Sequence, residues 1–194
     1  MSYLTLKEIE EIKSDVSLLS IDDIESISEY SFDSKIEEYN NFLEIAKKFS
    51  ELNISKTFLL IHRKTKELLA YMTLSADSIK LTNEEKEEHS IGKVPYVSLP
   101  ALKVGKLAVN RNLSENAKRK GYASFLLEMA RAYAYKMNEL GVACRFITVD
   151  ADIEYNPDTP TFYRKNGYIE NLKYRKKKAL HTISMRKDIW DEEE

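Results

Sequence analysis

The chain has 194 residues, 43% of them hydrophobic and 32% charged, with a formal net charge of −2, which is typical of a globular protein with one domain and a substantial core. It contains no apolar stretch long enough to cross a membrane, and its first residues lack the basic start and apolar core of a signal peptide. Its single cysteine, Cys144, excludes an internal disulfide and a cysteine-rich metal site, so we expect one cytoplasmic domain over residues 1–194 without a membrane partner.

The first part of the chain is predicted to be helical. Thr5 and Glu8 have the spacing of a capping box at the start of a helix. Asp33 or Ser34 can cap a second helix, in which apolar residues recur at i, i+3 and i+4 over 36–49. Both helices therefore precede the first expected strand.

Strands follow in the next part of the chain. The strand-like runs Thr57–His62 and Leu68–Leu74 are joined by a charged turn at Arg63–Glu67, a pattern that predicts a hairpin. Ile79–Leu81 is expected to extend the sheet. The polar stretch Thr82–Lys93 is expected to form a surface loop or a short helix.

A strand, a long helix and a buried strand are predicted next. The strand is Leu102–Val109, and an amphipathic helix runs from Gly121 to about Leu140, with Gly141 as its C-terminal cap. The continuous apolar run Cys144–Val149 is typical of a central strand.

The last predicted elements are a short helix and a hairpin. Asn156 and Pro157 look like an N-cap followed by proline at the first helical position, and the helix ends at Asn166-Gly167. The hairpin joins Tyr168–Tyr174 to Leu180–Met185 through a basic turn. The order of elements predicts a mixed α/β domain around one central sheet.

The segment Lys118–Ala123, at the start of the long helix, is predicted to bind an anion. The first amides of a helix have no partner within it, and the helix dipole makes that end electropositive. Gly121 lets the backbone approach a ligand closely. The loop lacks GxxxxGK[ST] and GxGxxG, so it is neither a nucleoside-triphosphate loop nor a dinucleotide fingerprint.

The distribution of charge agrees with an anionic ligand. Residues 1–56 carry 6 basic and 13 acidic side chains, a net charge of −7, whereas residues 101–190 carry 18 and 9, a net charge of +9. Residues 191–194 form an acidic tail. The anion-binding segment therefore lies in the basic half, although basic residues also commonly just solvate a surface.

Over residues 30–187 the chain resembles the GNAT N-acetyltransferases, whose loop [Q/R]-x-x-G-x-[G/A] stands here as Lys118 to Ala123, with lysine at the first position. A second GNAT motif, N-x-x-A-x-x-[L/F]-Y-x-[K/R]-x-G-[F/Y], is matched, with threonine in place of its alanine, at Asn156, Thr159, Phe162, Tyr163, Lys165, Gly167 and Tyr168. The resemblance implies a mixed α+β GNAT fold: a mostly antiparallel central sheet with splayed central strands, flanked by helices.

The resemblance also implies acetyl-CoA as co-substrate. In the family, the loop amides hold the pyrophosphate of the coenzyme, which here assigns Lys118, Arg119, Lys120, Gly121, Tyr122, Ala123 and Ser124 to cofactor binding. The preceding strand pairs with the pantetheine arm through Leu107, Ala108 and Val109. Asn156 either contacts the coenzyme, as in many members, or caps the helix before Pro157.

A narrower resemblance is to the bacterial toxin-type branch of the family. It rests on segments such as Tyr71–Ser75, Lys106–Asn110 and Val149–Ala151. Members acetylate the α-amine of aminoacyl-tRNA and are neutralised by an antitoxin protein, so both become expected partners here. A homodimer stays open. The basic run within Lys173–Lys178 either grips tRNA phosphates or is a solvated hairpin tip.

Tyr163 is the expected catalytic residue, because in the family the matching tyrosine lies beside the coenzyme sulfur, where its hydroxyl can protonate the departing thiolate. The alternative is a core aromatic. His62, His89 and His181 are scattered, so we expect surface or strand positions for them, no evident general base and no metal. Burial of Cys144 within a strand favours direct transfer over a ping-pong route.

The sequence thus predicts an acetyl-CoA-dependent N-acetyltransferase acting on a primary amine, with aminoacyl-tRNA as the leading acceptor. The acceptor can also be a small amine or a protein amine. From a different class, the domain can bind coenzyme A or a partner without turnover.

Overall fold

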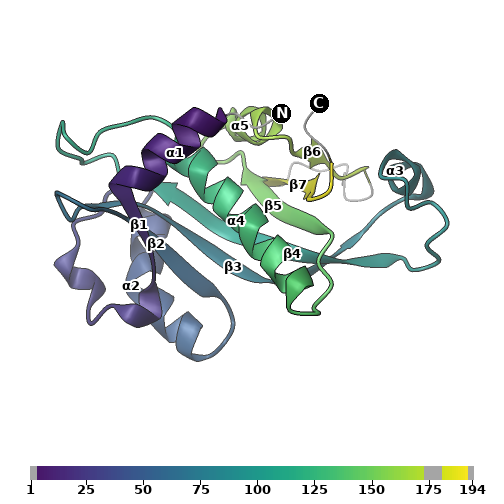
Figure 1. Cartoon of the computed structure of the whole chain (residues 1–194), viewed down its shortest axis with the longest axis horizontal. Coiled ribbons are helices and arrows are strands. Elements are labelled where there is room, and N and C mark those ends of the chain that lie inside the picture. The colour runs from purple at the N-terminus through teal and green to yellow at the C-terminus, as the bar shows by residue number, and fades with distance from the viewer. Residues whose placement is uncertain (1–3, 173–180, 192–194) are drawn as a thin grey trace. The chain divides into compact units, whose positions relative to one another are not determined.

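The computed structural model describes residues 4–172 and 181–191 (Figure 1). Its helices are α1 (Leu6–Asp15), α2 (Glu37–Glu51), α3 (Asn83–Glu88), α4 (Tyr122–Glu139) and α5 (Thr159–Lys165), with short 3-10 helices η1 (Ile21–Asp23) and η2 (Ile27–Glu29). Its strands are β1 (Val16–Ser20), β2 (Lys56–His62), β3 (Leu68–Lys80), β4 (Ser98–Val109), β5 (Phe146–Asp152), β6 (Ile169–Glu170) and β7 (Thr182–Asp188). The strands form one mostly antiparallel sheet in the order β1-β2-β3-β4-β5-β7-β6, so the mixed α/β prediction is confirmed.

The described chain forms two compact units. The N-terminal unit contains Leu4–Ser75 with Val104–Met129, and the C-terminal unit contains Ala76–Lys103 with the chain from Ala130 onward. The expectation of a single domain stays a prediction.

In the N-terminal unit, β1 was not predicted. It pairs antiparallel with β2, from Val16 opposite His62 to Ser20 opposite Phe58. The expectation that this part is helical is therefore wrong for Val16–Ser20. Five residues are too few to show a clear alternation, and this strand is specified by its partner rather than by its own pattern.

The core of the N-terminal unit lies between α2 and the strands β2 and β3 (Figure 1). The apolar spacing that predicted α2 places Leu43 and Ala46 in this core. They belong to a cluster of buried residues, the others being Ile21, Ile24, Leu59, Ile61, Leu68, Tyr71 and Ala108. The apolar face of α2 therefore packs into the core, as the helical period of its apolar residues predicts.

The predicted cap of α2 is wrong, because neither Asp33 nor Ser34 is its N-cap. The N-cap is Ile36, which makes no side-chain capping bond. Ser34 instead accepts from the backbone N–H of Ile36 at 3.2 Å, and the Asn40 amide oxygen accepts from the backbone N–H of Ser34 at 3.0 Å. These residues close the turn before the helix.

In the C-terminal unit, β5 and β7 pair antiparallel over their whole lengths, and β6 adds a short pair to β7. β5 begins at Phe146, so the predicted start at Cys144 is wrong by two residues. Cys144 is buried, as expected, and its backbone N–H donates to the side chain of Asn138 at 3.1 Å. Much of the predicted final hairpin, residues 173–180, lies outside the described residues.

The short helix predicted as one alternative for Thr82–Lys93 is confirmed, and most of the segment is exposed or half-buried. The segment does contain a short helix, α3, which begins with a capping box between Thr82 and Glu85. However, Glu85, Lys86 and His89 are all buried. Glu85 and His89 are buried because they meet Arg186 of β7, as described below, whereas the ammonium of Lys86 donates to the carbonyl oxygen of Val94.

Candidate functional site: the loop before α4 and a buried ion network

The loop that precedes α4 starts at Asn110, whose buried side chain joins three segments. Its amide nitrogen donates to the carbonyl oxygens of Ser31 and Leu68, at 2.9 and 2.8 Å. Its amide oxygen accepts from the backbone N–H groups of Asp33 and Asn112, at 3.2 and 3.0 Å. The end of β4 and the start of the loop are therefore fixed to β3 and to the segment before α2.

The middle of the loop is fixed by Glu67, in the turn between β2 and β3. Its carboxylate accepts from the backbone N–H of Ser114 at 2.8 Å and from the Ser114 hydroxyl at 2.6 Å. These two bonds hold the pKa of Glu67 below its usual value. The carboxylate therefore stays ionised, which keeps both bonds charge-assisted.

The end of the loop is fixed from within by Tyr122, the first residue of α4. Its hydroxyl donates to the carbonyl oxygen of Ala117 at 2.7 Å, and both groups are buried. Burial raises the pKa of the Tyr122 phenol, which therefore remains a donor at neutral pH.

Gly121 provides the backbone geometry that the anion prediction requires. Its φ is +100°, a backbone conformation that residues other than glycine rarely adopt. The first bond within α4 runs from the backbone N–H of Phe125 to the carbonyl oxygen of Gly121, at 2.8 Å. The N–H groups of Tyr122, Ala123 and Ser124 precede that bond and have no acceptor within the helix. They form an electropositive row of donors.

The three basic side chains of the loop differ in their surroundings. Lys118 lies 3.3 Å from the Glu115 carboxylate, and both side chains are exposed. Lys120 is exposed as well. Arg119 instead reaches Glu11 of α1, at 3.1 Å.

The strand residues assigned to the pantetheine arm lie at the end of β4. Ala108 is buried, and Leu107 and Val109 are half-buried. Just before them, the backbone N–H of Lys106 donates to the Thr73 hydroxyl at 2.8 Å. The loop and these three residues belong to the same unit, so the structure brings together most of the predicted cofactor-binding residues.

Tyr163 lies in the C-terminal unit, on α5. Its side chain is 7% exposed and packs edge-on against Phe162 and Tyr168, with ring centroids 5.1 and 5.5 Å apart. Its carbonyl oxygen accepts from the backbone N–H groups of Asn166 and Tyr168, and Gly167 between them has a φ of +81°. The motif Tyr163–Tyr168 thus closes α5 and fixes the position of the Tyr163 ring.

Asn156 was predicted either to contact coenzyme or to cap α5. The N-cap of α5 is Asp158, so the prediction that Asn156 is the cap is wrong by two residues. Its side-chain oxygen accepts from the backbone N–H of Asp158 at 3.1 Å, and its carbonyl oxygen accepts from that of Thr159. Asn156 therefore builds the turn that leads into α5.

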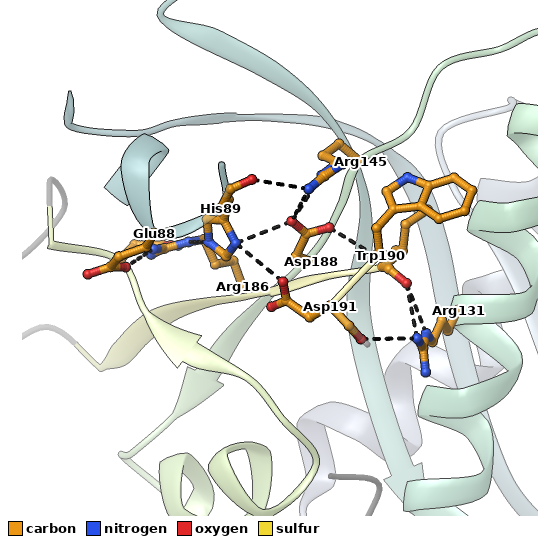
Figure 2. A network of polar contacts seen from close by, with 10 residues as sticks. Glu88, His89, Arg131, Arg145, Arg186, Asp188, Trp190 and Asp191 are labelled. Atoms are coloured by element: carbon orange, nitrogen blue, oxygen red, sulfur yellow. Dashed lines mark hydrogen bonds and ion pairs between the residues drawn. The ribbon is translucent and has the colours of Figure 1, made fainter. Parts of the chain in front are cut away.

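A network of buried charges, which the sequence did not predict, surrounds Arg186 of β7 (Figure 2). The guanidinium donates to the Glu85 carboxylate at 2.7 Å, to the Asn171 side chain at 3.0 Å and to the Glu88 carboxylate at 3.3 Å. Its Nε lies 3.1 Å from Nε2 of His89. These bonds attach α3 to β7.

Asp188 continues the network on the same strand (Figure 2). It accepts from Nε and Nη2 of Arg145, at 2.9 and 2.7 Å, and from the backbone N–H of Trp190 at 3.0 Å. Burial raises the pKa of Asp188, but bonds from His89, Trp190 and Arg145 outweigh it, so the pKa stays below its usual value. Asp188 is therefore a buried carboxylate.

His89, Asp188 and Asp191 have ligand atoms within 4.8 Å of one another, the spacing of a metal site. The surroundings of His89 do not fit a metal. The Nε–H of Arg186 can only donate, so Nε2 of His89 accepts and the ring proton is on Nδ1. Nδ1, 3.2 Å from Asp188, is the atom that a metal would need. The cluster is therefore a structural network.

Two of the three histidines lie where the sequence predicted, because His62 lies in the strand β2 and His181 is exposed and lies 2.9 Å from Glu154. The prediction is wrong for His89, which is buried just after α3. The Thr82–Glu85 spacing could have revealed the capping box of α3. Nothing local in the sequence indicates that Glu85 pairs with Arg186.

The Cys144 thiol belongs neither to the loop before α4 nor to the buried ion network. Burial raises its pKa to about 11, so it is protonated at neutral pH.

The basic residues of Lys173–Lys178 lie outside the described residues. Among the described helices, none is both long enough and apolar enough to span a membrane.

No protein-family model and no curated protein matches the chain. Solved structures do. A tyrosine-to-phenylalanine mutant of KacT is 20% identical, with 88% of this chain and 94% of that chain covered and a TM-score of 0.67. AtaT complexed with acetyl-methionyl-tRNAfMet is also 20% identical, with the same coverage and a TM-score of 0.66.

A third similar structure is a tyrosine-to-phenylalanine mutant of the toxin AtaT bound to the C-terminus of the antitoxin AtaR and acetyl-CoA. It is 19% identical, with 90% of this chain and 94% of that chain covered and a TM-score of 0.65. These likenesses show the fold: the chain has the GNAT fold of KacT and of the toxin AtaT, as the resemblance in the sequence implied.

Proposed function

We propose that this protein is an acetyl-CoA-dependent N-acetyltransferase. The observation that carries the proposal is the start of α4, where Gly121 at φ +100° leaves the amides of Tyr122, Ala123 and Ser124 without acceptors in the helix. Such a row of amides suits the pyrophosphate of coenzyme A. The fold shared with AtaT, of which one structure contains acetyl-CoA, supports the same cofactor.

In this proposal the loop residues Lys118–Ser124 hold the pyrophosphate through their backbone, and Leu107, Ala108 and Val109 pair with the pantetheine arm. We propose that Asn156 contributes to coenzyme binding indirectly, by shaping the turn before α5. Because the loop is already fixed by Asn110, Glu67 and Tyr122, little ordering is needed when the cofactor binds.

The transfer itself is a direct displacement. The neutral amine nitrogen attacks the thioester carbonyl carbon, a C–N bond forms and the C–S bond breaks. The hydroxyl of Tyr163 gives its proton to the departing thiolate, and water takes the proton that the new amide nitrogen loses. The protonated state of Cys144 supports direct transfer over an acyl-cysteine intermediate.

We propose aminoacyl-tRNA as the acceptor, through its α-amine. The net charge of +9 over residues 101–190 supports a nucleic-acid partner, because basic side chains supply affinity for phosphates. The shared fold with AtaT, which has been solved with acetyl-methionyl-tRNAfMet, also supports this acceptor. By the same reasoning from the complex of AtaT with AtaR, an antitoxin protein is a proposed partner.

The test is an acceptor screen with radiolabelled acetyl-CoA and purified protein. Charged tRNA, uncharged tRNA, peptides and polyamines are compared, and label is expected on charged tRNA and not on uncharged tRNA. Label on peptides or polyamines alone would replace the tRNA proposal, and coenzyme binding without transfer to any acceptor would contradict the enzymatic one.

The Tyr163→Phe variant tests the proton donor. We expect it to bind coenzyme A as the unmodified protein does, while the rate of transfer falls about 100-fold or more, as is usual when an acid catalyst is removed. Phe162→Leu, on the same helix, is the control for altered packing. Unchanged turnover in Tyr163→Phe would remove Tyr163 from the mechanism.

A further inference from the structure

Helix α1 precedes the first strand of the sheet and lies against the loop before α4. A Cβ atom placed on Gly121 would meet Cδ2 of Leu4 at 3.0 Å and Cδ1 of Ile12 at 3.4 Å. Both leucine and isoleucine side chains are buried, at 6% and 0% exposed. The glycine on which the amide row depends is thus covered by two apolar side chains, Ile12 of α1 and Leu4, which lies just before that helix.

An ion pair joins the same two segments. Nη2 of Arg119, in the loop, lies 3.1 Å from the Glu11 carboxylate of α1. Glu11 and Ile12 are neighbours in sequence, so one turn of α1 supplies both the charged and the apolar contact. The Arg119 side chain is 30% exposed, which leaves its contact with Glu11 only partly screened by solvent.

The end of α1 is attached to the same turn that holds the loop. The backbone N–H of Arg63 donates to the carbonyl oxygen of Asp15 at 2.8 Å, and its Nε donates to that of Val16 at 2.6 Å. This turn, between β2 and β3, also carries Glu67, which binds Ser114 of the loop. Helix and loop are therefore fixed to one common support.

We propose that α1 is a positioning element for the coenzyme loop, and that Arg119 acts through Glu11 rather than by contacting the coenzyme phosphates. This inference rests on the proposed function and adds to it, because it gives the Arg119 side chain a positioning role while the backbone amides hold the pyrophosphate. A loop held in its binding conformation loses little entropy when the ligand binds.

A double-mutant cycle with coenzyme A as the probe tests the role of Arg119. Glu11→Gln and Arg119→Gln are each expected to weaken binding about two- to fivefold, the range of a partly exposed ion pair. The double variant is expected to be no weaker than either single variant, because both remove the same contact. The kcat of transfer is expected to stay unchanged, so that only KM rises.

Glu10→Gln is the matched control, since Glu10 is an exposed carboxylate on the same helix. It should bind coenzyme A as the unmodified protein does. If Arg119→Gln weakens binding strongly while Glu11→Gln does not, or if the two effects multiply in the double variant, Arg119 contacts the ligand directly and the inference is wrong.

Amide hydrogen exchange without ligand tests the apolar contact by which α1 and the preceding Leu4 position the loop. In Leu4→Ala, exchange of the amides of residues 119–124 is expected to rise about tenfold while the amides of α2 keep their rates. Ile12→Val provides a milder variant if Leu4→Ala does not fold. Unchanged exchange in the loop of a folded variant would overturn the inference.

The two readouts separate this inference from the proposed function. If the unmodified protein does not bind coenzyme A, the proposed function fails, but the exchange experiment still decides whether α1 orders the loop. If coenzyme A binds and loop exchange is unaffected in Leu4→Ala, only the role of α1 is lost.

Discussion

The carboxylate of Glu85 accepts a hydrogen bond from the guanidinium of Arg186 at 2.7 Å, and the two side chains are 0% and 1% exposed. The residues are 101 positions apart in the chain. Burial raises the pKa of Glu85, but bonds from the backbone of Thr82 and Leu172 and the charge of Arg186 outweigh it, so the pKa stays below its usual value. The pair is therefore ionised, and each charge depends on the other.

The first prediction concerns the loss of one partner. Arg186→Met should lower the free energy of unfolding by about 3–5 kcal/mol, because it leaves Glu85 charged and buried without its partner. The double variant Glu85→Gln, Arg186→Met should recover part of this loss. Urea denaturation followed by circular dichroism measures the free energy of unfolding of both variants. Glu88→Gln, which changes a more exposed partner of Arg186, is the control. A loss below 1 kcal/mol in Arg186→Met would contradict the importance of the pair.

The second prediction concerns acid. The pKa values of Glu85 and Asp188 are lowered in the folded state, so the unfolded chain binds protons more readily at low pH. Their contribution to stability is therefore complete above the ordinary carboxyl range, at about pH 4, and is lost as the pH falls through the lowered values. Urea denaturation at pH 7, 5 and 3 should show little change between the first two and a clear drop at pH 3. A constant free energy of unfolding down to pH 3 would contradict it.

The third prediction concerns two glycines with positive φ. Gly121→Ala should lower stability by about 1–3 kcal/mol through backbone strain, and its Cβ would also lie 3.0 Å from Leu4. Gly141→Ala has a similar φ, +84°, but its Cβ meets nothing within 4 Å, so it carries the strain without the contact. Thermal denaturation and coenzyme A titration should show that both lose stability and that only Gly121→Ala loses affinity. Equal affinities in the two variants would show that the loop tolerates the contact.

The fourth prediction concerns Asn110. Asn110→Ala removes four hydrogen bonds and leaves buried backbone groups without partners, which should cost about 3 kcal/mol of unfolding free energy. Asn112→Ala, on the exposed part of the same loop, is the control and should cost less than 0.5 kcal/mol, about the usual effect of a surface substitution. Similar losses in both would mean that the loop, and not the side chain of Asn110, sets the stability of this region.

Many features that depend on neighbouring residues were predicted, although the N-caps of α2 and α5 were not. The capping box of Thr5 and Glu8 is present, and Gly141 and Gly167 have the positive φ values that helix ends require. The apolar period of α2 places Leu43 and Ala46 in the core. Each of these follows from a spacing of a few residues, which the sequence displays directly.

Features that depend on distant partners were missed. The strand β1 has too few residues to show its own period and is defined by its pairing with β2. The burial of Glu85 and His89 depends on Arg186, which follows them by 101 and 97 residues. The pairing of Arg119 with Glu11 is of the same kind, since 108 positions separate them. In the candidate site, the sequence indicated the loop and Tyr163, but not the contacts that hold the loop.

The buried position of Cys144 has a practical consequence for labelling. With its pKa raised to about 11, only about one thiol in ten thousand is ionised at pH 7, and the side chain is also shielded from reagents. A cysteine introduced on the surface, for example in place of exposed Glu115, would then be the one reactive thiol of the protein. A fluorophore attached there would report on the loop before α4 without mutation of the native cysteine.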